Sequence, residues 1–207
     1  MGKERQLRKQ EEIRNAILDA AQKIISKDGV QRLSIRKITN EIDYSPAIIY
    51  HYFKDKNEIV ETLVSEGYER ILDSIGEVKK NEDEPEKELK EVFTNYIKAA
   101  LAASEEYKAF MLNDNPSVLM KTGLLEKGIC KKSQTLQMLC DNLQRGINQG
   151  RYTPFDPELT SQIIWTSTFG LIIKLVIEKD ISEEQINRLI DHHFSVFFNG
   201  IMIRKED

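Results

Sequence analysis

The side chains best suited to bind an anion gather in one short stretch of the sequence. Tyr50 and His51 supply hydrogen-bond donors and rings, and Lys54 and Lys56 add two positive charges shortly after them. Cations and donors of this kind bind phosphate groups, and donors held in a fixed register read base edges. These residue types therefore make the stretch a candidate anion-binding surface. The alternatives are that His51 is an ordinary surface residue and that the two lysines form a merely solvated face.

No other part of the sequence has a pattern typical of an enzyme. The sequence contains no glycine-rich phosphate loop, no serine nucleophile motif and no cluster with metal-ligand spacing. His192 and His193 could form a pH switch or a metal site, but no Cys, Asp or Glu stands at a supporting distance in the sequence. We therefore expect no catalytic residue, no metal and no cofactor.

The chain has two cysteines, Cys130 and Cys140. Because both fall in a stretch with a helical pattern, we expect them about 15 Å apart, too far for a disulfide bond. They are interpreted as small, buried, apolar residues. The alternative is a redox or electrophile sensor, although no basic cluster stands nearby in the sequence to stabilise a thiolate.

The charge of the chain is divided unevenly along its 207 residues. The formal net charge is -4, which taken alone argues against a nucleic-acid partner. Residues 1–57, however, contain 12 Lys and Arg against 8 Asp and Glu, a net of +4, and the rest of the chain carries -8. A basic segment before an acidic one predicts that only the first part meets a polyanion. Within it, Arg5, Arg8 and Lys9 could form an arm that touches the minor groove, or a disordered tail.

Apolar residues recur at helical spacing almost throughout, and no segment alternates in the manner of a strand. With 40% hydrophobic residues, 10 Gly and 5 Pro, the composition favours a folded chain of long helices. We therefore predict an all-α protein of about nine helices. The expected helices cover residues 10–27, 35–42, 46–53, 55–75, 85–103, 107–112, 118–149 with a possible break near Gly123, 157–178 and 183–198.

No segment of the sequence is expected to cross a membrane or to direct export. Residues 1–9 are charged and lack the apolar core of a signal peptide. The longest apolar run near the C-terminus, residues 169–173, ends at Lys174, whereas a membrane span needs about 20 such residues. The chain is therefore expected to be soluble and cytoplasmic.

Two short helices joined by a tight turn are expected to position the anion-binding stretch. Ser34 is a good N-cap for a helix over residues 35–42, and Ser45 precedes a proline that begins a second helix over residues 46–53. Isoleucines in both helices are spaced to pack the two together. This is the spacing of a helix-turn-helix, in which the first helix crosses the phosphate backbone and the second enters the major groove.

Residues 17–59 resemble the N-terminal domain of TetR-family repressors. The resemblance rests on ILDAA near its start, on Gly29, and above all on IIYHYFKDKNEI, which is close to the family signature LYYHFKxKExL. It implies an all-α fold with an N-terminal three-helix DNA-binding domain and a C-terminal helical domain that binds a ligand and dimerises. We place the two domains at residues 1–57 and 58–207.

The resemblance also implies which residues contact DNA. Ser34, Arg36 and Lys37 match positions that face the phosphate backbone. Ser45 and Ala47 match the positions nearest the base edges. The remaining contacts to phosphates and bases match positions in or next to the signature itself, namely Tyr50, His51, Lys54 and Lys56.

The sequence departs from the family pattern at two places. Thr39 stands where the family usually has alanine, and residues 43–45 read Asp-Tyr-Ser where it usually has Gly-Val-Ser. Neither departure removes a hydrogen-bond donor, but Tyr44 makes the turn bulkier and is expected to alter the choice of base. Tyr52 and Phe53 are expected to be core aromatics, because the family packs the second of them inward.

The last two expected helices carry broad apolar faces with small residues among them. The resemblance implies that they form a four-helix bundle with the same helices of a second copy. The alternative is that they pack only within the chain. The residues expected at the dimer interface are Ile163, Thr166, Gly170, Ile173, Ile190, His193, Phe194 and Phe197.

A ligand pocket is expected among the middle helices of the C-terminal domain. Each candidate residue, taken singly, is better explained as part of the core, but as a set they indicate a small, largely apolar effector. The candidates are Tyr68, Phe93, Tyr96, Phe110, Met111, Met120, Met138, Trp165 and Phe169.

These features together predict a dimeric, ligand-responsive transcriptional repressor. Binding of the effector would favour a conformation in which the two DNA-binding heads no longer fit a palindromic operator. The alternatives are a dimeric DNA-binding protein without a ligand and an enzyme, which the missing motifs disfavour.

Overall fold

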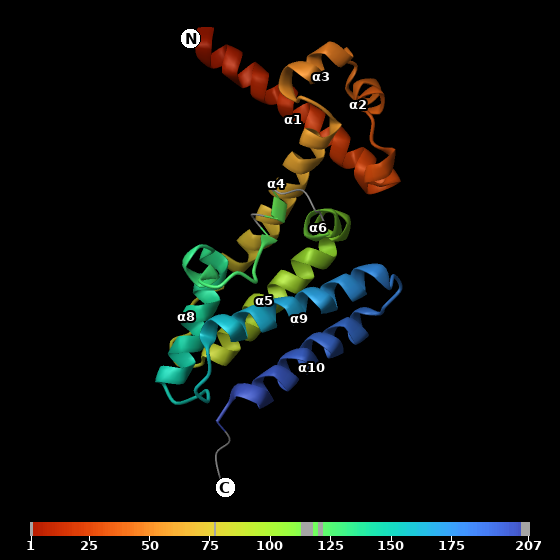
Figure 1. The fold of residues 1–207 in the computed structure, drawn as a ribbon. Helices are drawn as coiled ribbons and strands as arrows, with labels where there is room; N and C mark the ends of the chain where they lie inside the picture. The colour runs from red at the N-terminus through yellow and green to blue at the C-terminus, as the bar shows by residue number, and fades with distance from the viewer. Residues whose placement is uncertain (1, 77, 113–117, 120–121, 204–207) are drawn as a thin grey trace. The chain divides into compact units, whose positions relative to one another are not determined.

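The fold is built from α-helices, as predicted (Figure 1). The computed structural model describes residues 2–76, 78–112, 118–119 and 122–203. Nine α-helices and two short 3-10 helices are formed within those residues. No strand occurs among them, apart from an isolated antiparallel bridge between Tyr152 and Met202.

The chain divides into two compact units. Unit 1 comprises Met1–Glu69 and Glu105–Val118, and unit 2 comprises Arg70–Ser104 and Leu119–Asp207. Helix α4 (Lys56–Gly76) therefore contributes residues to both units. The division into a DNA-binding and a ligand-binding domain after residue 57 is a statement about function and stays a prediction.

Unit 1 has a core of isoleucines closed by one phenylalanine. Ile17, Ile38 and Ile49 are fully buried, and Phe53 is buried beside them, as expected. Each helix thus turns one apolar stripe towards a common core. The elements of unit 1 are α1 (Gly2–Asp28), η1 (Val30–Arg32), α2 (Ile35–Ile42), α3 (Pro46–Tyr52), the first part of α4, and α6 (Ser104–Met111).

Side-chain caps determine where the helices of unit 1 begin. The hydroxyl of Ser34 accepts a hydrogen bond from the backbone N–H of Lys37 at 3.3 Å and so caps α2, as predicted. Asp55 Oδ1 accepts from the N–H of Glu58 at 3.0 Å. The Glu58 carboxylate reaches back to the N–H of Lys54, so donors on both sides of the start of α4 are satisfied.

Unit 2 packs its helices around four aromatic side chains, none more than 3% exposed. The ring of Trp165 lies 5.6 Å from that of Phe93 and 5.0 Å from that of Tyr96. The ring of Phe194 lies 5.8 Å from that of Phe93. The elements of unit 2 are the rest of α4, α5 (Pro85–Ala102), η2 (Ile129–Lys131), α8 (Gln134–Asn148), α9 (Pro157–Ile177) and α10 (Glu183–Ile201).

Two ion pairs attach α5 to the end of α8. Arg145 Nη2 lies 2.5 Å from Glu88 Oε2, which also accepts the N–H of Asn81 at 2.7 Å. Arg151, which follows α8, pairs with Glu86 through both its Nε and its Nη2. Because the carboxylates of these pairs are largely shielded from water, losing one partner would leave an uncompensated charge.

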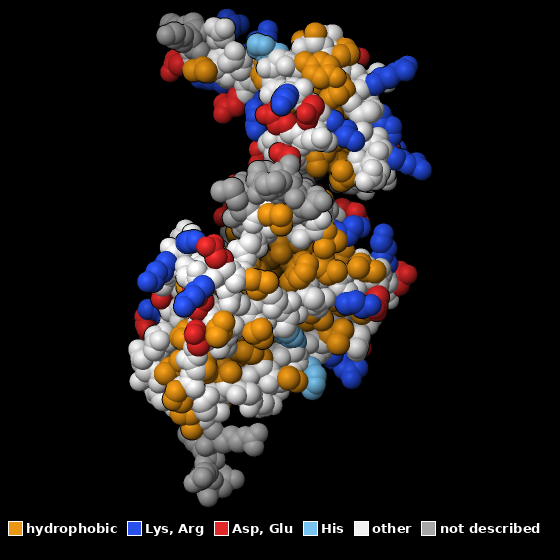
Figure 2. Space-filling view, viewed as in Figure 1, with side chains coloured by type: hydrophobic (Ala, Val, Ile, Leu, Met, Phe, Trp, Pro, Cys, Tyr) orange, Lys and Arg blue, Asp and Glu red, His pale blue; other side chains and the backbone are white. Residues whose placement is uncertain are grey.

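Helix α9 is apolar on its exposed side as well as on its buried side. Figure 2 shows hydrophobic side chains on the face of unit 2 where α9 lies. An 18-residue window of this helix has a mean hydropathy of 1.4, so by length and composition alone the helix could cross a membrane. The sequence pattern did not predict such a helix. Of that window, 44% is buried within the protein, and α9 packs on α5 and α8. A core helix of a soluble protein has the same properties.

The long helix predicted over residues 118–149 is interrupted, which corrects the prediction. Gly128 adopts a left-handed conformation with φ of 84°, and η2 follows it directly. Ser133 then caps a new helix, because its hydroxyl accepts the N–H of Leu136 at 3.4 Å. The chain therefore changes direction before α8 begins.

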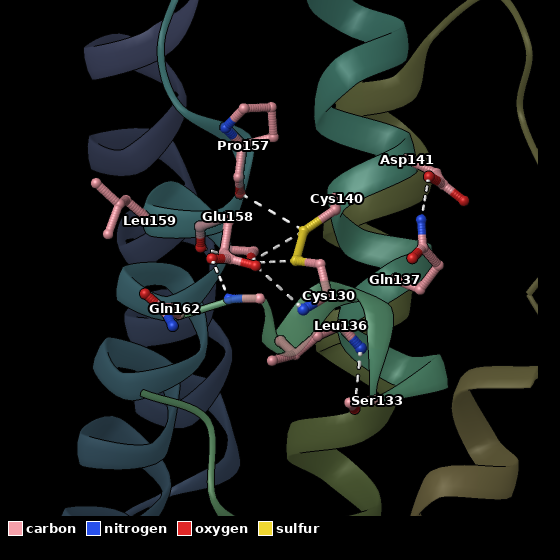
Figure 3. Close-up of a disulfide and its surroundings, with 12 residues drawn as sticks. Cys130, Ser133, Leu136, Gln137, Cys140, Asp141, Pro157, Glu158, Leu159 and Gln162 are labelled. Atoms are coloured by element: carbon pink, nitrogen blue, oxygen red, sulfur yellow. Dashed lines mark hydrogen bonds between the residues drawn. A yellow bond between two sulfur atoms is a disulfide. The ribbon is translucent and has the colours of Figure 1, made fainter. Parts of the chain in front are cut away.

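This change of direction brings Cys130 and Cys140 together in a disulfide (Figure 3). Their Cα atoms are 6.5 Å apart, so the expectation of two unbridged thiols is wrong. Cys140 Sγ lies 3.5 Å from the hydroxyl of Ser161, and Glu158 accepts the N–H groups of Gly128 and Cys130 at 2.8 and 3.3 Å. The first turn of α9 thus holds the loop that carries the disulfide.

Candidate nucleic-acid interface and ligand hollow

The helix-turn-helix is formed by α2 and α3 of unit 1. Asp43 ends α2 in a left-handed conformation with φ of 57°, and Pro46 occupies the first turn of α3. Ile38 and Ile49 are both fully buried, so each helix is fixed to the core by one face. The opposite faces of the two helices are left for solvent.

The nine residues predicted to bind DNA lie on α2, on α3 and around the starts of α2 and α4. Seven of them are exposed, and Ser34 and Lys56 are half-buried. Tyr50 is 57% exposed, whereas Tyr52 packs partly against the core. Figure 2 shows Lys and Arg side chains projecting from unit 1. Their contact with DNA stays a prediction.

One of the four Lys and Arg residues among these nine already has an acidic partner within unit 1. Lys37 Nζ lies 2.6 Å from Asp28 Oδ2. The hydrogen bond from Lys37 lowers the pKa of Asp28 below its usual value, so this carboxylate stays charged beside the candidate surface. The pair could not be predicted from the sequence, because Asp28 ends a different helix.

The departure from the family pattern at Thr39 has a simple structural basis. Thr39 is 7% exposed, and its hydroxyl donates to the backbone carbonyl of Arg36 at 2.9 Å. The polar atom is therefore satisfied within the helix, and the methyl group takes the place of a small apolar side chain. Tyr44, in the turn, is 38% exposed and available to a ligand.

A small hollow with room of about 40 Å³, partly open to solvent, is lined by residues of α4, α5, α8 and α9 in unit 2. Three of the predicted pocket residues, Phe93, Met138 and Trp165, are among them. The other lining residues were not predicted, although all of them except Ile75 share a helix with Phe93 or Met138. These missed residues are Ile75, Glu88, Leu89, Val92, Thr135, Leu139 and Asn142.

Three predicted pocket residues lie in unit 1 and do not line this hollow, so their part in a ligand pocket stays a prediction. Tyr68 and Phe110 stack on each other there, with ring centroids 4.2 Å apart, and Met111 is half-buried on α6. Met120 lies outside the described residues. An apolar pattern identifies residues that are shielded from water but does not say in which core they are shielded.

Two further predicted pocket residues lie in unit 2 but do not line the hollow. Tyr96 is buried behind Trp165, whose ring it contacts. Phe169 is half-buried one turn further along α9. Tyr96 therefore supports a wall of the hollow from behind.

Two buried polar atoms on residues that line the hollow have no hydrogen-bond partner. They are Oδ1 of Asn142 and Nε1 of Trp165, and each residue is 3% exposed. The Asn142 amide nitrogen donates to the carbonyl of Pro85 at 3.0 Å, which identifies Oδ1 as the unused acceptor. Burying such an atom without a partner costs about 1–3 kcal/mol.

The residues predicted at the dimer interface divide into two sets. Ile163 is 65% exposed, Gly170 is exposed, and the predicted residues Thr166, Ile173, His193 and Phe197 are half-buried. Ile190 and Phe194, by contrast, are 2% and 0% exposed, because α10 turns them into the core of its own unit. Their assignment to the interface is therefore corrected, and that of the other six stays a prediction.

His193 lies between the core and the exposed side of α10. Its Nε2 is 3.2 Å from the hydroxyl of Thr168, and burial lowers the pKa of His193 below its usual value. The described residues contain no group of three or more His, Cys, Asp or Glu that could hold a metal. The alternative interpretation of His192 and His193 as a metal site therefore gains no support from them.

Comparison with known proteins identifies relatives of the N-terminal part and of the whole fold. The family model of bacterial regulatory proteins of the tetR family matches residues 17–63. The fatty acid metabolism regulator protein of Bacillus subtilis is 24% identical over 168 residues, which are 77% of this chain and 79% of that protein. The HTH-type transcriptional regulator UidR of Escherichia coli K12 is 32% identical over 59 residues, 28% of this chain and 30% of UidR.

Solved structures share the fold over nearly the whole chain. The ketosteroid transcriptional regulator KstR2 of Mycobacterium tuberculosis covers 92% of this chain and 95% of its own, with a TM-score of 0.65 and 17% identity. A tetR-family regulatory protein from Rhodococcus RHA1 covers 93% of this chain and 98% of its own, with a TM-score of 0.68 and 15% identity. At these low sequence identities the likeness shows a shared fold alone.

Proposed function

We propose that the chain is a transcriptional regulator of the TetR family, and a repressor released from DNA by a small effector. In this proposal a homodimer binds a palindromic operator through α2, α3 and the start of α4. The two recognition helices then occupy half-sites about 34–36 Å apart or a multiple of that distance. We also propose that the protein acts in the cytoplasm.

The observation that carries the DNA-binding part is the exposure of donors and cations on an otherwise well-packed helix-turn-helix. Tyr50, His51 and Lys54 are exposed, whereas Ile49 and Phe53 next to them are buried. A rigid core with a polar outer face is what a recognition helix needs, because ordered side chains lose little entropy when they meet the groove.

Homodimerisation is supported by apolar surface on α9 and α10. Leu159, Ile163 and Ile177 of α9 are 57–65% exposed, and Val196 of α10 is 59% exposed. Single exposed apolar residues are ordinary, but several on neighbouring helices favour a partner. A second copy would cover each patch with its own equivalent, as two-fold symmetry requires.

The effector is proposed to bind in the hollow of unit 2. The printed name of the Bacillus subtilis relative refers to fatty acid metabolism, which supports an apolar effector here only by analogy. Binding would select one of two conformations, and α4, which contributes to both units, would carry the change to the DNA-binding head. The hollow has room of only about 40 Å³, far below the roughly 300–1,000 Å³ of ligand pockets, so it would have to widen to admit an effector. This keeps a ligand-free regulator as the second candidate.

Selection of an operator from random or genomic DNA tests the proposal. The selected duplex should bind more weakly as salt increases, and Tyr50→Ala and Lys56→Ala should weaken it. Lys98→Ala is a matched control, because Lys98 is an exposed lysine of unit 2. Affinity that is independent of salt, or unchanged in both head variants, would contradict the proposal. If no compound that occupies the hollow releases the duplex, the ligand-free regulator is favoured.

A further inference from the structure

We infer that the outer face of α3 selects thymine in each half-site of the operator, through the C5-methyl group that thymine alone presents in the major groove. Pro46 and Ala47 would make this apolar contact. The inference rests on the proposed function, because it specifies which base pairs the DNA-binding face selects.

The first step identifies the side chains of α3 that face away from the core. Ile49 is 0% exposed, so the side of the helix that contains it is fixed against unit 1. The exposed residues are related by steps of three and four positions and therefore share the opposite side. They are Pro46, Ala47, Tyr50 and His51. A recognition helix meets the base edges with its N-terminal residues, which here are Pro46 and Ala47.

The second step is the chemistry that this face lacks. Guanine is read by Arg or Lys, adenine by Asn or Gln, and cytosine by Asp or Glu. None of these residue types occurs in residues 44–53, all of which the structure describes. Ser45 has a free choice of bases, because a serine hydroxyl both donates and accepts. Asn40 of α2 lines a separate surface hollow with Lys23 and Lys27 of α1. The bidentate hydrogen bonds that select the other three bases are therefore missing from α3.

The third step is the reach of the two side chains. Alanine ends at Cβ, and the ring of proline closes on its own backbone, so neither extends far into a groove. The C5-methyl group of thymine projects into the major groove, and its contact with Pro46 or Ala47 would remove apolar surface of both partners from water. The amino groups of adenine and cytosine would instead lose a hydrogen bond to water against an apolar side chain. Thymine is thus the base that short apolar side chains favour.

Cations for the phosphate backbone are placed outside α3. Arg36 on α2 and Lys54 after α3 are exposed, and Lys56 at the start of α4 is half-buried. Phosphate contacts of this kind fix the register of the protein on DNA but carry no sequence information. The division of charge therefore leaves the apolar face of α3 to select bases.

Replacement of thymine by 2′-deoxyuridine tests the inference, because uracil keeps the pairing with adenine and lacks only the methyl group. Each thymine of the selected operator is replaced in turn, at equivalent positions of both half-sites, and the affinity of the full-length protein is measured by titration. At one or two thymines of each half-site, the affinity should fall by about 4-fold for each methyl group lost, and therefore by about 15-fold for both half-sites together. Thymines that flank the half-sites are the control, and their replacement should leave the affinity unchanged.

Two variants assign the preference to its residue. Ala47→Gly removes the apolar carbon and should move the ratio of the affinities for thymine and uracil duplexes towards one. Arg36→Ala, which removes an exposed cation of α2, should weaken binding to both duplexes and retain that ratio. An unchanged ratio in Ala47→Gly would refute the role of Ala47. Equal affinity of the unaltered protein for thymine and uracil duplexes at every position, or a selected half-site without thymine, would overturn the inference even where Ala47→Gly does not fold.

The salt dependence of binding, measured on the same duplexes, separates the inference from the proposed function. Salt-dependent binding of a selected operator without a preference for thymine over uracil would refute the inference and leave the DNA-binding regulator intact. If no operator is selected, the proposed function and the inference both fail.

Discussion

Lys37 Nζ lies 2.6 Å from Asp28 Oδ2, so a cation that matches a phosphate-binding position of the family is held by an acid of its own unit. Lys37 must leave Asp28, or share its charge between Asp28 and a phosphate, when DNA binds. The side chains of both residues are partly exposed, at 43% and 29%, so solvent weakens the pair and an exchange of partners costs little.

Replacement of Asp28 by Asn is expected to strengthen DNA binding by about two- to fivefold at low salt, because it removes a negative charge beside the phosphates. Lys37→Gln should weaken binding and reduce the slope of log affinity against log salt by about 0.9. Both are measured by titration of a selected operator at several salt concentrations. Asp19→Asn, at an exposed position of α1, is the control. An unchanged salt slope in Lys37→Gln would show that Lys37 serves only Asp28.

Asp43 provides a second prediction, because it ends α2 in the left-handed conformation. Glycine adopts this conformation without strain, Asp tolerates it, and alanine does so only at a cost of about 1 kcal/mol. Asp43→Gly should therefore raise the free energy of unfolding by up to about 1 kcal/mol, and Asp43→Ala should lower it. Urea denaturation measures both, and equal stability of the two variants would contradict the assignment.

The helix starts could be predicted from the sequence because capping acts over three residues. Ser34 and Ser182 each accept an N–H three residues ahead at 3.3 Å, and Asp156 caps α9 in the same way. Helix α1 begins at Gly2 and not at the predicted residue 10, because residues 2–9 are almost wholly polar and give no periodic signal. A helix start can therefore be predicted where the capping residue and its partner stand close together in the sequence.

The disulfide and the hollow could not be predicted in the same way. Cys130 and Cys140 meet because the chain breaks at Gly128 and restarts at Ser133, and no strong apolar signal marks that break. Which residues line the hollow depends on which faces of four different helices point towards the same space. Asn142 in particular reads as a polar surface residue until its neighbours are known, yet it is 3% exposed.

The disulfide is expected to stabilise unit 2 by about 3 kcal/mol, since it closes a short loop in the unfolded chain. In urea denaturation, the double variant Cys130→Ser, Cys140→Ser should have a free energy of unfolding lower by that amount. A reductant should destabilise only the unaltered protein. Thiol labelling of the denatured, unreduced protein should detect no free cysteine. Two labelled thiols in protein purified under oxidising conditions would contradict the bond. The cytoplasm is reducing, so the bond would be subject to reduction there.

His193 makes stability depend on pH. Burial lowers its pKa in the folded protein, so below about pH 6.5 the unfolded chain takes up a proton that the folded chain resists. The contribution is full above that pH and is lost as the pH falls towards the lowered pKa. His193→Gln, which can keep a hydrogen bond to Thr168, should flatten the decline between pH 7 and pH 5. The control is His192→Gln, at an exposed position, and an equal effect of both variants would exclude a special role for His193.

Ile163 tests whether the exposed face of α9 is covered by a second copy. It is 65% exposed in the single chain, so Ile163→Asp should cost the folded monomer little. In a symmetric dimer the same change would place two carboxylates in an apolar contact, because each interface residue occurs twice. Sedimentation should therefore show a dimer for the unaltered protein and a monomer for Ile163→Asp, with operator affinity reduced in parallel. Leu125→Asp, at a position 73% exposed outside α9 and α10, should leave the dimer intact. A variant at Ile163 that remained a dimer would place the interface on another surface.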